Sequence, residues 1–330
     1  MEEKTCEQIK EDIFNTLKMR YKLDILSDKK INKGYLNYKW KIYTDKGNFF
    51  VKQYNKKRYP DDMLDGLERS LNQHAYLYEN GIPCPKLFIY EKKYVQYSIG
   101  GERFVLMELK NGNMIKAGSA TIDQMYSLGR NIGKMHKLLN TKRQVDLPLH
   151  WKIPSKKQMM DNWLSRWDEA IKLKDEIVLP ILEKQRNIIE GMHIEHFSQC
   201  EKGWAHWDLF VDNVLFTSNQ VAAILDFDRM NYVFPEFDLS RAILSCCLKD
   251  NYLQLEPVSA YLEGYRDDCD ITLQKLVRSI RLTWWKESSW IRAGKSAEKT
   301  LQRFCEENKW IGDNWNELEF IFSEINLLHH

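Results

Sequence analysis

Four polar residues stand at the margins of apolar, strand-like runs in the second half of the chain. Asp208 and Asn213 lie five residues apart in one such segment. The next strand-like run, Val221–Leu225, leads directly into Asp226 and Asp228. Burying carboxylates and amides beside a strand costs several kcal/mol unless they are paired or bind a metal ion. The pattern therefore indicates chemistry rather than packing.

Phosphoryl transfer from a nucleotide requires this set of groups. One carboxylate accepts the proton of the attacking hydroxyl, and an amide oxygen with a second carboxylate holds Mg²⁺ against the phosphates. We therefore expect Asp208 to be the catalytic base. We expect Asn213 and Asp226 to be metal ligands, with Asp228 assisting a second metal ion.

The spacing of these residues matches a known group of enzymes. His206-x-Asp208-x-x-x-x-Asn213, followed by an apolar residue and Asp226-x-Asp228, resembles the aminoglycoside phosphotransferase and choline kinase superfamily, small-molecule relatives of protein kinases. Within it, the stretch from His206 to Asn213 is most similar to type II homoserine kinases. The resemblance extends in patches from about residue 31 to 245, and the last eighty residues match no pattern that we can name.

The resemblance implies a site for ATP in the first part of the chain. Lys52 stands where the strand lysine of the family contacts the α- and β-phosphates, and Gly34 and Asn37 lie in what looks like the phosphate-covering turn. Glu68 is the best candidate for the helix glutamate that pairs with this lysine, although the usual position falls nearer Ser70. ATP and Mg²⁺ are thus the expected cofactors.

Further positions carry over from the family in the same way. Met107, Glu108 and Leu109 resemble the hinge whose backbone binds adenine, and Asp238 matches an aspartate that supports the catalytic loop. Trp207 stands where the family usually has glycine, which crowds the loop and bears on the acceptor pocket.

For several tryptophan and histidine residues we favour a structural role over a role in the site. The cluster of Trp284, Trp285 and Trp290 invites a cation–π cage for an amine substrate. Because the chain has 11 tryptophans, core packing is the favoured interpretation. We also expect structural roles for His206 and for His136.

The elements that must position these residues fall into two parts. Alternating residues in 31–43 and 48–54 around Asp45-Lys46-Gly47 predict a β-hairpin. A helix follows over 62–80, then strands over 87–99 and 103–109. After residue 112 helical periodicity dominates, except for the strand–loop–strand segment 204–228.

The predicted fold is α+β and two-lobed, like that of protein kinases. Residues 1–110 form a small lobe with an antiparallel sheet and one helix, and residues 111–330 form a larger, mostly helical lobe with the catalytic loop and substrate pocket. The nucleotide is expected between the lobes.

Composition excludes several other classes. The chain of 330 residues is 43% hydrophobic and 29% charged, with a net charge of +2, so neither wholesale disorder nor a general attraction to nucleic acid or anionic membranes is expected. Its seven cysteines lack the paired spacings of a zinc ribbon or disulfide framework. No long apolar run or secretory signal is apparent, so we expect a cytoplasmic protein.

We therefore expect an ATP-dependent kinase that phosphorylates a hydroxyl, or less readily an amine, of a small molecule. Homoserine, choline-like amines, sugars, aminoglycosides and macrolides all remain open as acceptors, and the oligomeric state is open too. The alternative is a catalytically weak or inactive kinase-fold protein with a structural or binding role, of which spore-coat proteins in this superfamily are a precedent.

Overall fold

The chain divides into two compact units in the computed structural model, which describes residues 4–32, 36–141, 147–294 and 299–325. The first unit comprises residues 1–112 and 222–229, and the second comprises 113–221 and 230–330. Asp226 and Asp228 therefore belong to the first unit, whereas Asp208 and Asn213 belong to the second.

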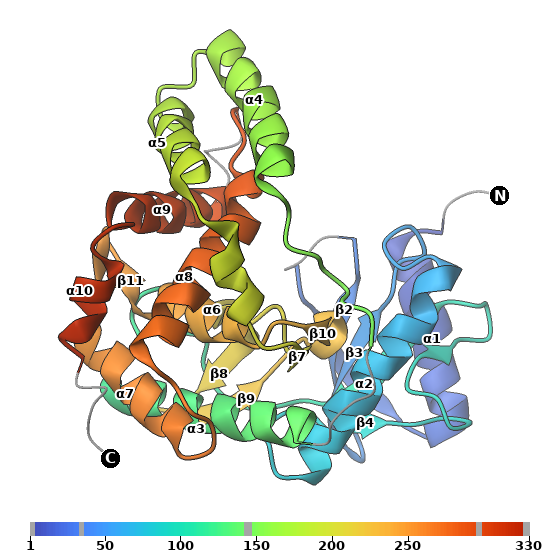
Figure 1. Ribbon diagram of the computed structural model, residues 1–330. Coiled ribbons are helices and arrows are strands. Elements are labelled where there is room, and N and C mark those ends of the chain that lie inside the picture. The colour runs from blue at the N-terminus through green and yellow to red at the C-terminus, as the bar shows by residue number, and fades with distance from the viewer. Residues whose placement is uncertain (1–3, 33–35, 142–146, 295–298, 326–330) are drawn as a thin grey trace. The chain divides into compact units, whose positions relative to one another are not determined.

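An antiparallel sheet forms the centre of the first unit (Figure 1). Its strands are, in order across the sheet, β1 (Ile25–Lys30), β2 (Lys39–Thr44), β3 (Gly47–Gln53), β6 (Arg103–Glu108) and β4 (Leu87–Phe88), with β5 (Gln96–Tyr97) also paired to β6. The predicted hairpin is confirmed as β2 and β3, with Thr44 opposite Gly47 and Lys39 opposite Lys52. Its first strand begins at Lys39 and not at Ile31.

Two longer helices belong to this unit. α2 (Leu64–Glu79) confirms the predicted helix and follows a short 3-10 turn, η1 (Asp61–Met63). The N-terminal helix α1 (Cys6–Tyr21) was not predicted, although it starts with a capping box at Thr5. Its stripe of buried apolar residues packs with residues of the sheet in one core cluster, with members Ile9, Ile13, Leu17, Trp40, Val51 and Phe104.

The prediction of one long strand over 87–99 is wrong. The chain forms only the short strands β4 and β5, because it reverses direction between Tyr90 and Lys93, whose backbones exchange both hydrogen bonds. The two residues at this turn, Glu91 and Lys92, have positive φ angles of 48° and 65°. Such turns usually carry Asn or Gly, so the sequence contained no signal for this one.

The second unit is mostly helical. Its elements are α3 (Ile122–Asn140), α4 (Lys156–Leu173), α5 (Val178–Gly191), η2 (Ile194–Gln199), β7 (Gly203–Ala205), η3 (Val211–Asn213), β8 (Val214–Phe216), β10 (Asn231–Val233), α6 (Glu236–Cys247), β11 (Leu248–Lys249), β12 (Tyr252–Leu253), α7 (Leu255–Arg266), α8 (Leu273–Glu287), η5 (Ser288–Trp290), α9 (Lys299–Asp313) and α10 (Leu318–Ser323). β9 (Val221–Ile224) begins in this unit and leads into η4 (Phe227–Arg229) of the first.

Helices α3 and α7 of this unit pack with their backbones in close contact. A Cβ atom added at Gly129 would lie 1.9 Å from the backbone oxygen of Tyr261, and one added at Gly133 would lie 2.6 Å from that of Tyr265. Only glycine permits the two backbones to approach this far. The i, i+4 glycine pair thus has a packing role.

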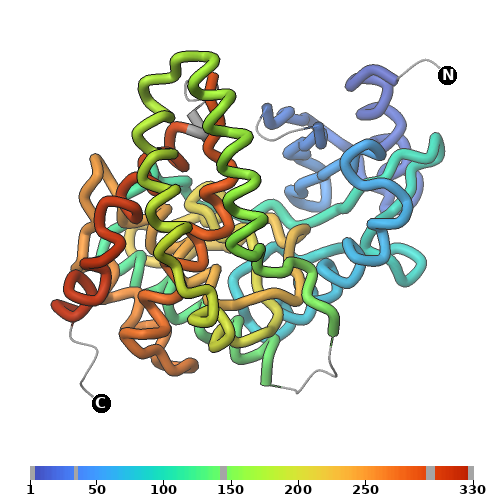
Figure 2. Tube along the Cα trace, turned by 45° about the horizontal axis from the view of Figure 1, so that its top comes forward, coloured from blue at the N-terminus to red at the C-terminus, as the bar shows by residue number. Residues whose placement is uncertain are grey.

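Helices α4 and α5 lie side by side and antiparallel, and both views of the chain show this pair at the edge of the second unit (Figures 1 and 2). None of the described helices has both the length and the apolar character needed to cross a bilayer.

Candidate active site

The predicted catalytic loop follows β7 and includes Asp208 and Asn213. The side-chain Nδ2 of Asn213 donates to the carbonyl oxygen of Asp208 at 2.8 Å and to its carboxylate Oδ2 at 3.2 Å. The backbone N–H of Phe210 also donates to the carbonyl of Asp208, at 2.8 Å. Because the NH₂ group of Asn213 is used in this way, its amide oxygen faces elsewhere. These bonds hold the predicted base, Asp208, and the predicted metal ligand, Asn213, together.

Asp238, at the start of α6, binds the backbone of this loop. Its carboxylate is fully buried and accepts hydrogen bonds from the backbone N–H groups of His206, at 2.6 Å, and Trp207, at 2.9 Å. His136 Nε2 lies 3.1 Å from the same carboxylate, and His136 Nδ1 lies 3.0 Å from the hydroxyl of Tyr265. Asp238 thus has the supporting role that the family pattern implies, and His136 is a packed residue of the same network.

Trp207 adopts a backbone conformation that glycine would reach without strain. Its φ angle is +64°, in the left-handed region that costs a bulky residue of the order of 1–3 kcal/mol. The indole is buried, with ring centroids 4.6 Å from Phe237 and 5.7 Å from Trp151. The two hydrogen bonds to Asp238 and this packing hold the strained residue in place.

Lys52 forms ion pairs with two carboxylates of the first unit. It projects from β3, is 5% exposed, and donates through Nζ to Asp226 Oδ1 at 2.5 Å and to the carboxylate of Asp228. Burial opposes the charge on this ammonium, but the attraction of the two carboxylates is stronger, so the pKa of Lys52 is raised. Lys52 is therefore a cation at neutral pH, as binding to phosphate groups requires.

Two tyrosine hydroxyls hold Asp228. Tyr54 donates to its Oδ1 at 2.9 Å and Tyr59 to its Oδ2 at 3.4 Å. Burial, together with the charge of Asp228, raises the pKa of both hydroxyls, so both stay protonated donors. Sequence reasoning missed these residues, although Tyr54 follows Lys52 by two positions and thus shares its face of an extended chain.

Lys39 is a second cation that sequence reasoning missed. It lies directly opposite Lys52 in the β2–β3 register, and its Nζ is 3.7 Å from Asp226 Oδ2. Burial and the neighbouring Lys52 lower its pKa. The turn at 45–47 fixes this register, so counting back along the predicted hairpin would have paired the two lysines.

The expected pair between Glu68 and Lys52 is not formed. The two carboxylate oxygens of Glu68 accept the backbone N–H groups of Tyr94, at 2.7 Å, and Val95, at 3.0 Å. Among the described residues, the carboxylates that contact the Lys52 ammonium are those of Asp226 and Asp228. Glu68 thus anchors the segment before β5, which local sequence could not reveal.

Of the residues predicted to form the hinge, Met107 and Glu108 end β6 and Leu109 follows it directly. The N–H of Glu108 donates to the carbonyl of Lys86 at 2.9 Å, and that of Leu109 donates to the carbonyl of Asn48 at 3.2 Å. The backbone donors expected to bind adenine are therefore used inside the first unit.

Asn37 and Gly34 were predicted to cover the phosphates. The Asn37 side chain is buried, and its Oδ1 accepts the backbone N–H of Asn55 at 3.1 Å. Its Nδ2 is buried without a hydrogen-bond partner among the described residues, which suits an acceptor such as a phosphate oxygen. Gly34 lies outside the described residues.

The metal ligands predicted from sequence all offer oxygen atoms, which Mg²⁺ prefers. Asp226 also has a positive φ, +61°, and its side chain is 27% exposed against 5% for Asp228. In the described parts of the chain, no three His, Cys, Asp or Glu side chains gather as a ready-made metal centre. The oxygen donors of Asn213, Asp226 and Asp228 thus fit Mg²⁺ by their chemistry.

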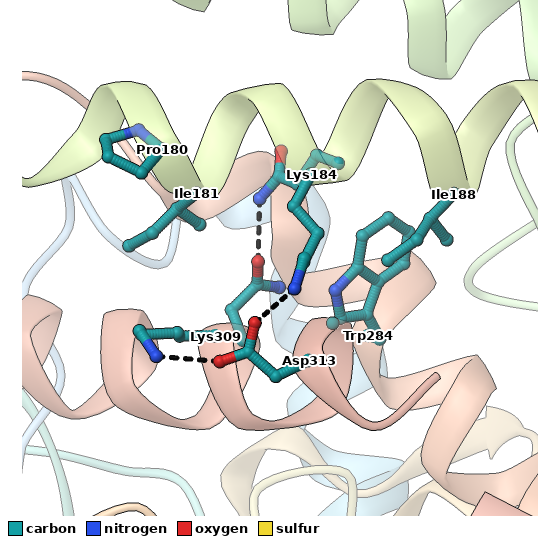
Figure 3. A pocket seen from close by; sticks show the side chains of 10 residues that line it. Pro180, Ile181, Lys184, Ile188, Trp284, Lys309 and Asp313 are labelled. Atoms are coloured by element: carbon teal, nitrogen blue, oxygen red, sulfur yellow. Dashed lines mark hydrogen bonds and ion pairs between the residues drawn. The ribbon is translucent and has the colours of Figure 1, made fainter. Parts of the chain in front are cut away.

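A cavity of about 180 Å³ lies between α5, α8 and α9, and none of the predicted site residues lines it (Figure 3). Its polar side chains bond to one another: Gln185 Nε2 donates to Asn308 Oδ1 at 2.7 Å, and Lys309 donates to Asp313 at 2.7 Å. Trp284, one of the tryptophans singled out in the sequence, lines it and is nearly fully buried, as core packing predicts.

Comparison with known proteins identifies the family of this chain. The model of the phosphotransferase enzyme family matches residues 28–272, about three quarters of the sequence. The chain belongs to the phosphotransferase enzyme family. A homoserine kinase of Bartonella tribocorum is 24% identical over 313 residues, covering 92% of this chain and 91% of that relative.

Solved structures of small-molecule kinases share the fold. The amicoumacin kinase hAmiN, in complex with AMP-PNP, Ca²⁺ and Ami, aligns with a TM-score of 0.54 at 18% identity, covering 92% of this chain and 96% of that one. A microcompartment-associated aminopropanol kinase aligns with a TM-score of 0.59 at 15% identity, covering 93% and 98%. The predicted α+β, kinase-like fold is confirmed, and so is the predicted class, an ATP-dependent small-molecule phosphotransferase.

Proposed function

We propose that this phosphotransferase moves the γ-phosphoryl group of ATP to the hydroxyl of a small amino alcohol, with Asp208 as the base. The relatives support the acceptor class. Homoserine and aminopropanol, named in a relative and in a solved structure, each carry one hydroxyl and one amine. The single observation that carries the mechanism is the pairing of Asp208 and Asn213 in one braced loop.

Asp208 acts as the base because its carboxylate is held in a fixed position. Asn213 holds one carboxylate oxygen of Asp208, and Asp238 holds the backbone that precedes it. The acceptor hydroxyl hydrogen-bonds to the Asp208 carboxylate, which receives its proton as the oxygen attacks phosphorus. Most of the rate enhancement then comes from orientation and electrostatic stabilisation.

Lys52 and Asn37 would bind the phosphates of ATP. Lys52 is held as a cation by Asp226 and Asp228, and exchanges part of this contact for phosphate oxygens when the nucleotide binds. Asn37 supplies its unpartnered Nδ2 as a donor.

Asn213 and Asp226 would bind Mg²⁺, with Asp228 as a further oxygen donor. The ion would neutralise phosphate charge and orient the transferred group. Lys39 and Lys52 both form ion pairs with the carboxylate of Asp226.

The test is ADP release by the purified protein with MgATP and a panel of homoserine, aminopropanol, ethanolamine, choline, a sugar, an aminoglycoside and a macrolide. We expect turnover with an amino alcohol. In Asp208→Asn, turnover should fall by about 10²–10⁴-fold while ATP affinity stays within a few fold. Asp226→Ala should lose the Mg²⁺ dependence of ATP binding.

Two results would contradict the proposal. If Asp208→Asn folds but loses ATP binding, Asp208 is not the base. If no acceptor releases ADP and ATP with Mg²⁺ does not raise the melting temperature, the protein is instead a kinase-fold binding or structural protein.

A further inference from the structure

The cavity between α5, α8 and α9 combines buried polar groups with exposed charges, and we call it the α5–α9 cavity. Gln185 and Trp284, which line it, are each only 1% exposed. Lys184 and Lys309 also line it, and both pair with Asp313 at more exposed positions. All of its lining residues lie in the second unit, so the cavity belongs wholly to that unit.

The indole N–H of Trp284 is a buried donor without an acceptor. Its Nε1 has no hydrogen-bond partner among the residues that the structure describes. Figure 3 shows this nitrogen on the edge of the ring that faces Lys184 and Asp313. A buried donor left unsatisfied costs about 1–3 kcal/mol, and folded proteins rarely leave one so. The indole therefore calls for an acceptor that a molecule in the cavity would supply.

A buried cation lies next to the cavity. Arg166 of α4 is 1% exposed and donates through Nη1 to Gln185 Oε1 at 2.9 Å and to the carbonyl oxygen of Ser288 at 2.7 Å. Within the described ranges of the chain, no carboxylate pairs with this guanidinium, and its Nη2 has no hydrogen-bond partner. Burial, with the neighbouring charge of Arg292, lowers the pKa of Arg166 to about 10, so it is still a cation at neutral pH. An anion in the cavity would offset part of the cost of burying this charge.

The lining of the cavity carries more positive than negative charge. Its two lysines share one carboxylate, that of Asp313, and Arg166 adds a third cation through Gln185. The walls are also apolar, with Ile181 and Ile188 beside the indole ring. A ligand that suits both features has one negative charge and a short apolar body. Inorganic phosphate offers the charge without the apolar part.

We propose that the α5–α9 cavity binds a small organic monocarboxylate, whose carboxylate group accepts hydrogen bonds from the Trp284 indole N–H and from Lys184. Lys184 then divides its contacts between this ligand and Asp313, and the apolar body packs against Ile181 and Ile188. None of the described residues that line the cavity belongs to the predicted active site. This is therefore a second small-molecule site and not the place of the acceptor, and the inference does not depend on the proposed function.

The test compares carboxylates with their neutral amides on the full chain. The pairs are benzoate with benzamide and butyrate with butyramide, and inorganic phosphate serves as an anion without an apolar body. Binding is measured by isothermal titration calorimetry without nucleotide. At least one carboxylate should bind at least about tenfold more tightly than its amide, the range of a charge-assisted hydrogen bond, and more tightly than phosphate.

Substitution of Lys184 tests the role of its charge. Lys184→Met should weaken binding of the carboxylate about tenfold or more and change that of the amide less than about twofold. Arg186→Met is the matched control and should keep the preference in full. Arg186 lies two positions further along α5, is similarly exposed and pairs with Glu190, and it does not line the cavity.

Filling the cavity tests the location of the site. Gly312 of α9 lines it, and a Cβ atom added there would lie 3.3 Å from Cδ of the flexible Lys184 side chain. Gly312→Leu should therefore abolish binding of the carboxylate. Gly191→Leu is the matched control, because a Cβ atom at Gly191 meets nothing within 4 Å, and it should bind the carboxylate as the wild type does.

Three results overturn the inference. They are no binding of any carboxylate, which would leave the cavity to water alone, no preference for a carboxylate over its amide and phosphate, and a preference that persists in Lys184→Met or in folded Gly312→Leu. Circular dichroism checks the fold of each variant. If Gly312→Leu does not fold, Lys184→Met decides, since Lys184 is an exposed residue whose substitution leaves the core intact.

Discussion

The two groups of acidic residues in this protein are held by different forces. In the first unit, Asp226 and Asp228 are held by direct charge contacts with Lys52 and by tyrosine hydroxyls. In the second, Asp208 is held by an amide and by a loop whose backbone N–H groups bind Asp238.

This difference suits two tasks. Ion pairs can exchange one partner for another. Under the proposed function, Lys52 would exchange part of its contact with the carboxylates for phosphate oxygens, and Asp226 and Asp228 would offer their oxygens to Mg²⁺. Hydrogen bonds from backbone N–H groups to a buried carboxylate leave no such alternative, because breaking them strands buried donors. The first unit is thus built to exchange partners, and the catalytic loop is built to stay in place.

Loss of Asp238 should have the largest effect on stability. Asp238→Ala leaves the N–H groups of His206 and Trp207 without their acceptor and removes the restraint on the strained Trp207. We expect the free energy of unfolding to fall by about 3–5 kcal/mol, measured by urea denaturation. Asp267→Ala, which removes a surface pair with Arg130, should change it by less than about 1 kcal/mol. Equal effects would mean that Asp238 is not a brace.

Glu287 should give the second unit a pH-dependent stability. Burial raises the pKa of Glu287 to about 7, against the attraction of the buried Arg241, with which Glu307 also pairs. The unfolded carboxyl loses its proton near pH 4.5 and the folded one near 7. The folded state therefore holds the extra proton in this window, and stability falls as pH rises through it, by up to about 3 kcal/mol. Denaturation of wild type and Glu287→Gln from pH 4.5 to 8 checks this, and parallel curves would contradict it.

Substitutions of Asp226 and of Asp228 should differ in their effects on stability and on ATP binding, although Lys52 binds both carboxylates. Asp228→Asn should lower the free energy of unfolding by about 1–2 kcal/mol, because its side chain is buried and bound by Tyr54 and Tyr59. Asp226→Asn should cost less stability, since its side chain is more exposed, but should weaken Mg²⁺-dependent ATP binding more. Urea denaturation and calorimetric titration with MgATP test both variants. If Asp226→Asn lowered stability more and Asp228→Asn weakened ATP binding more, the roles of the two residues would be exchanged.

Glu68 should matter only to stability. Glu68→Gln keeps one oxygen for Tyr94 or Val95 but loses the charge, so we expect a loss of about 1 kcal/mol and ATP affinity within twofold of wild type. Glu79→Gln, on the exposed end of the same helix, is the matched control. A fall in ATP affinity confined to Glu68→Gln would show that this glutamate serves Lys52 after all.

Much of the fold and of the site could be predicted because its signals are local. The turn at 45–47 set the β2–β3 hairpin, and the spacing from His206 to Asn213 identified the loop and the family. The positive-φ turn at Glu91 and Lys92 could not be predicted, because those residue types do not favour it. Helix α1 could have been predicted, since Thr5, Gln8 and its apolar stripe are ordinary helix signals.

The sequence by itself determined the class of enzyme, the elements that carry its chemistry, and the identities of Lys52, Asp208, Asn213 and Asp226 as candidates. Only the tertiary structure decided which groups bind which. Lys52 binds Asp226, 174 residues away, and not Glu68, and the three aromatic rings that contact the Lys286 ammonium come from three segments. Local pattern fixes where a side chain stands on its own element, but the partner of a buried charge depends on which elements pack together, and no short-range pattern records that.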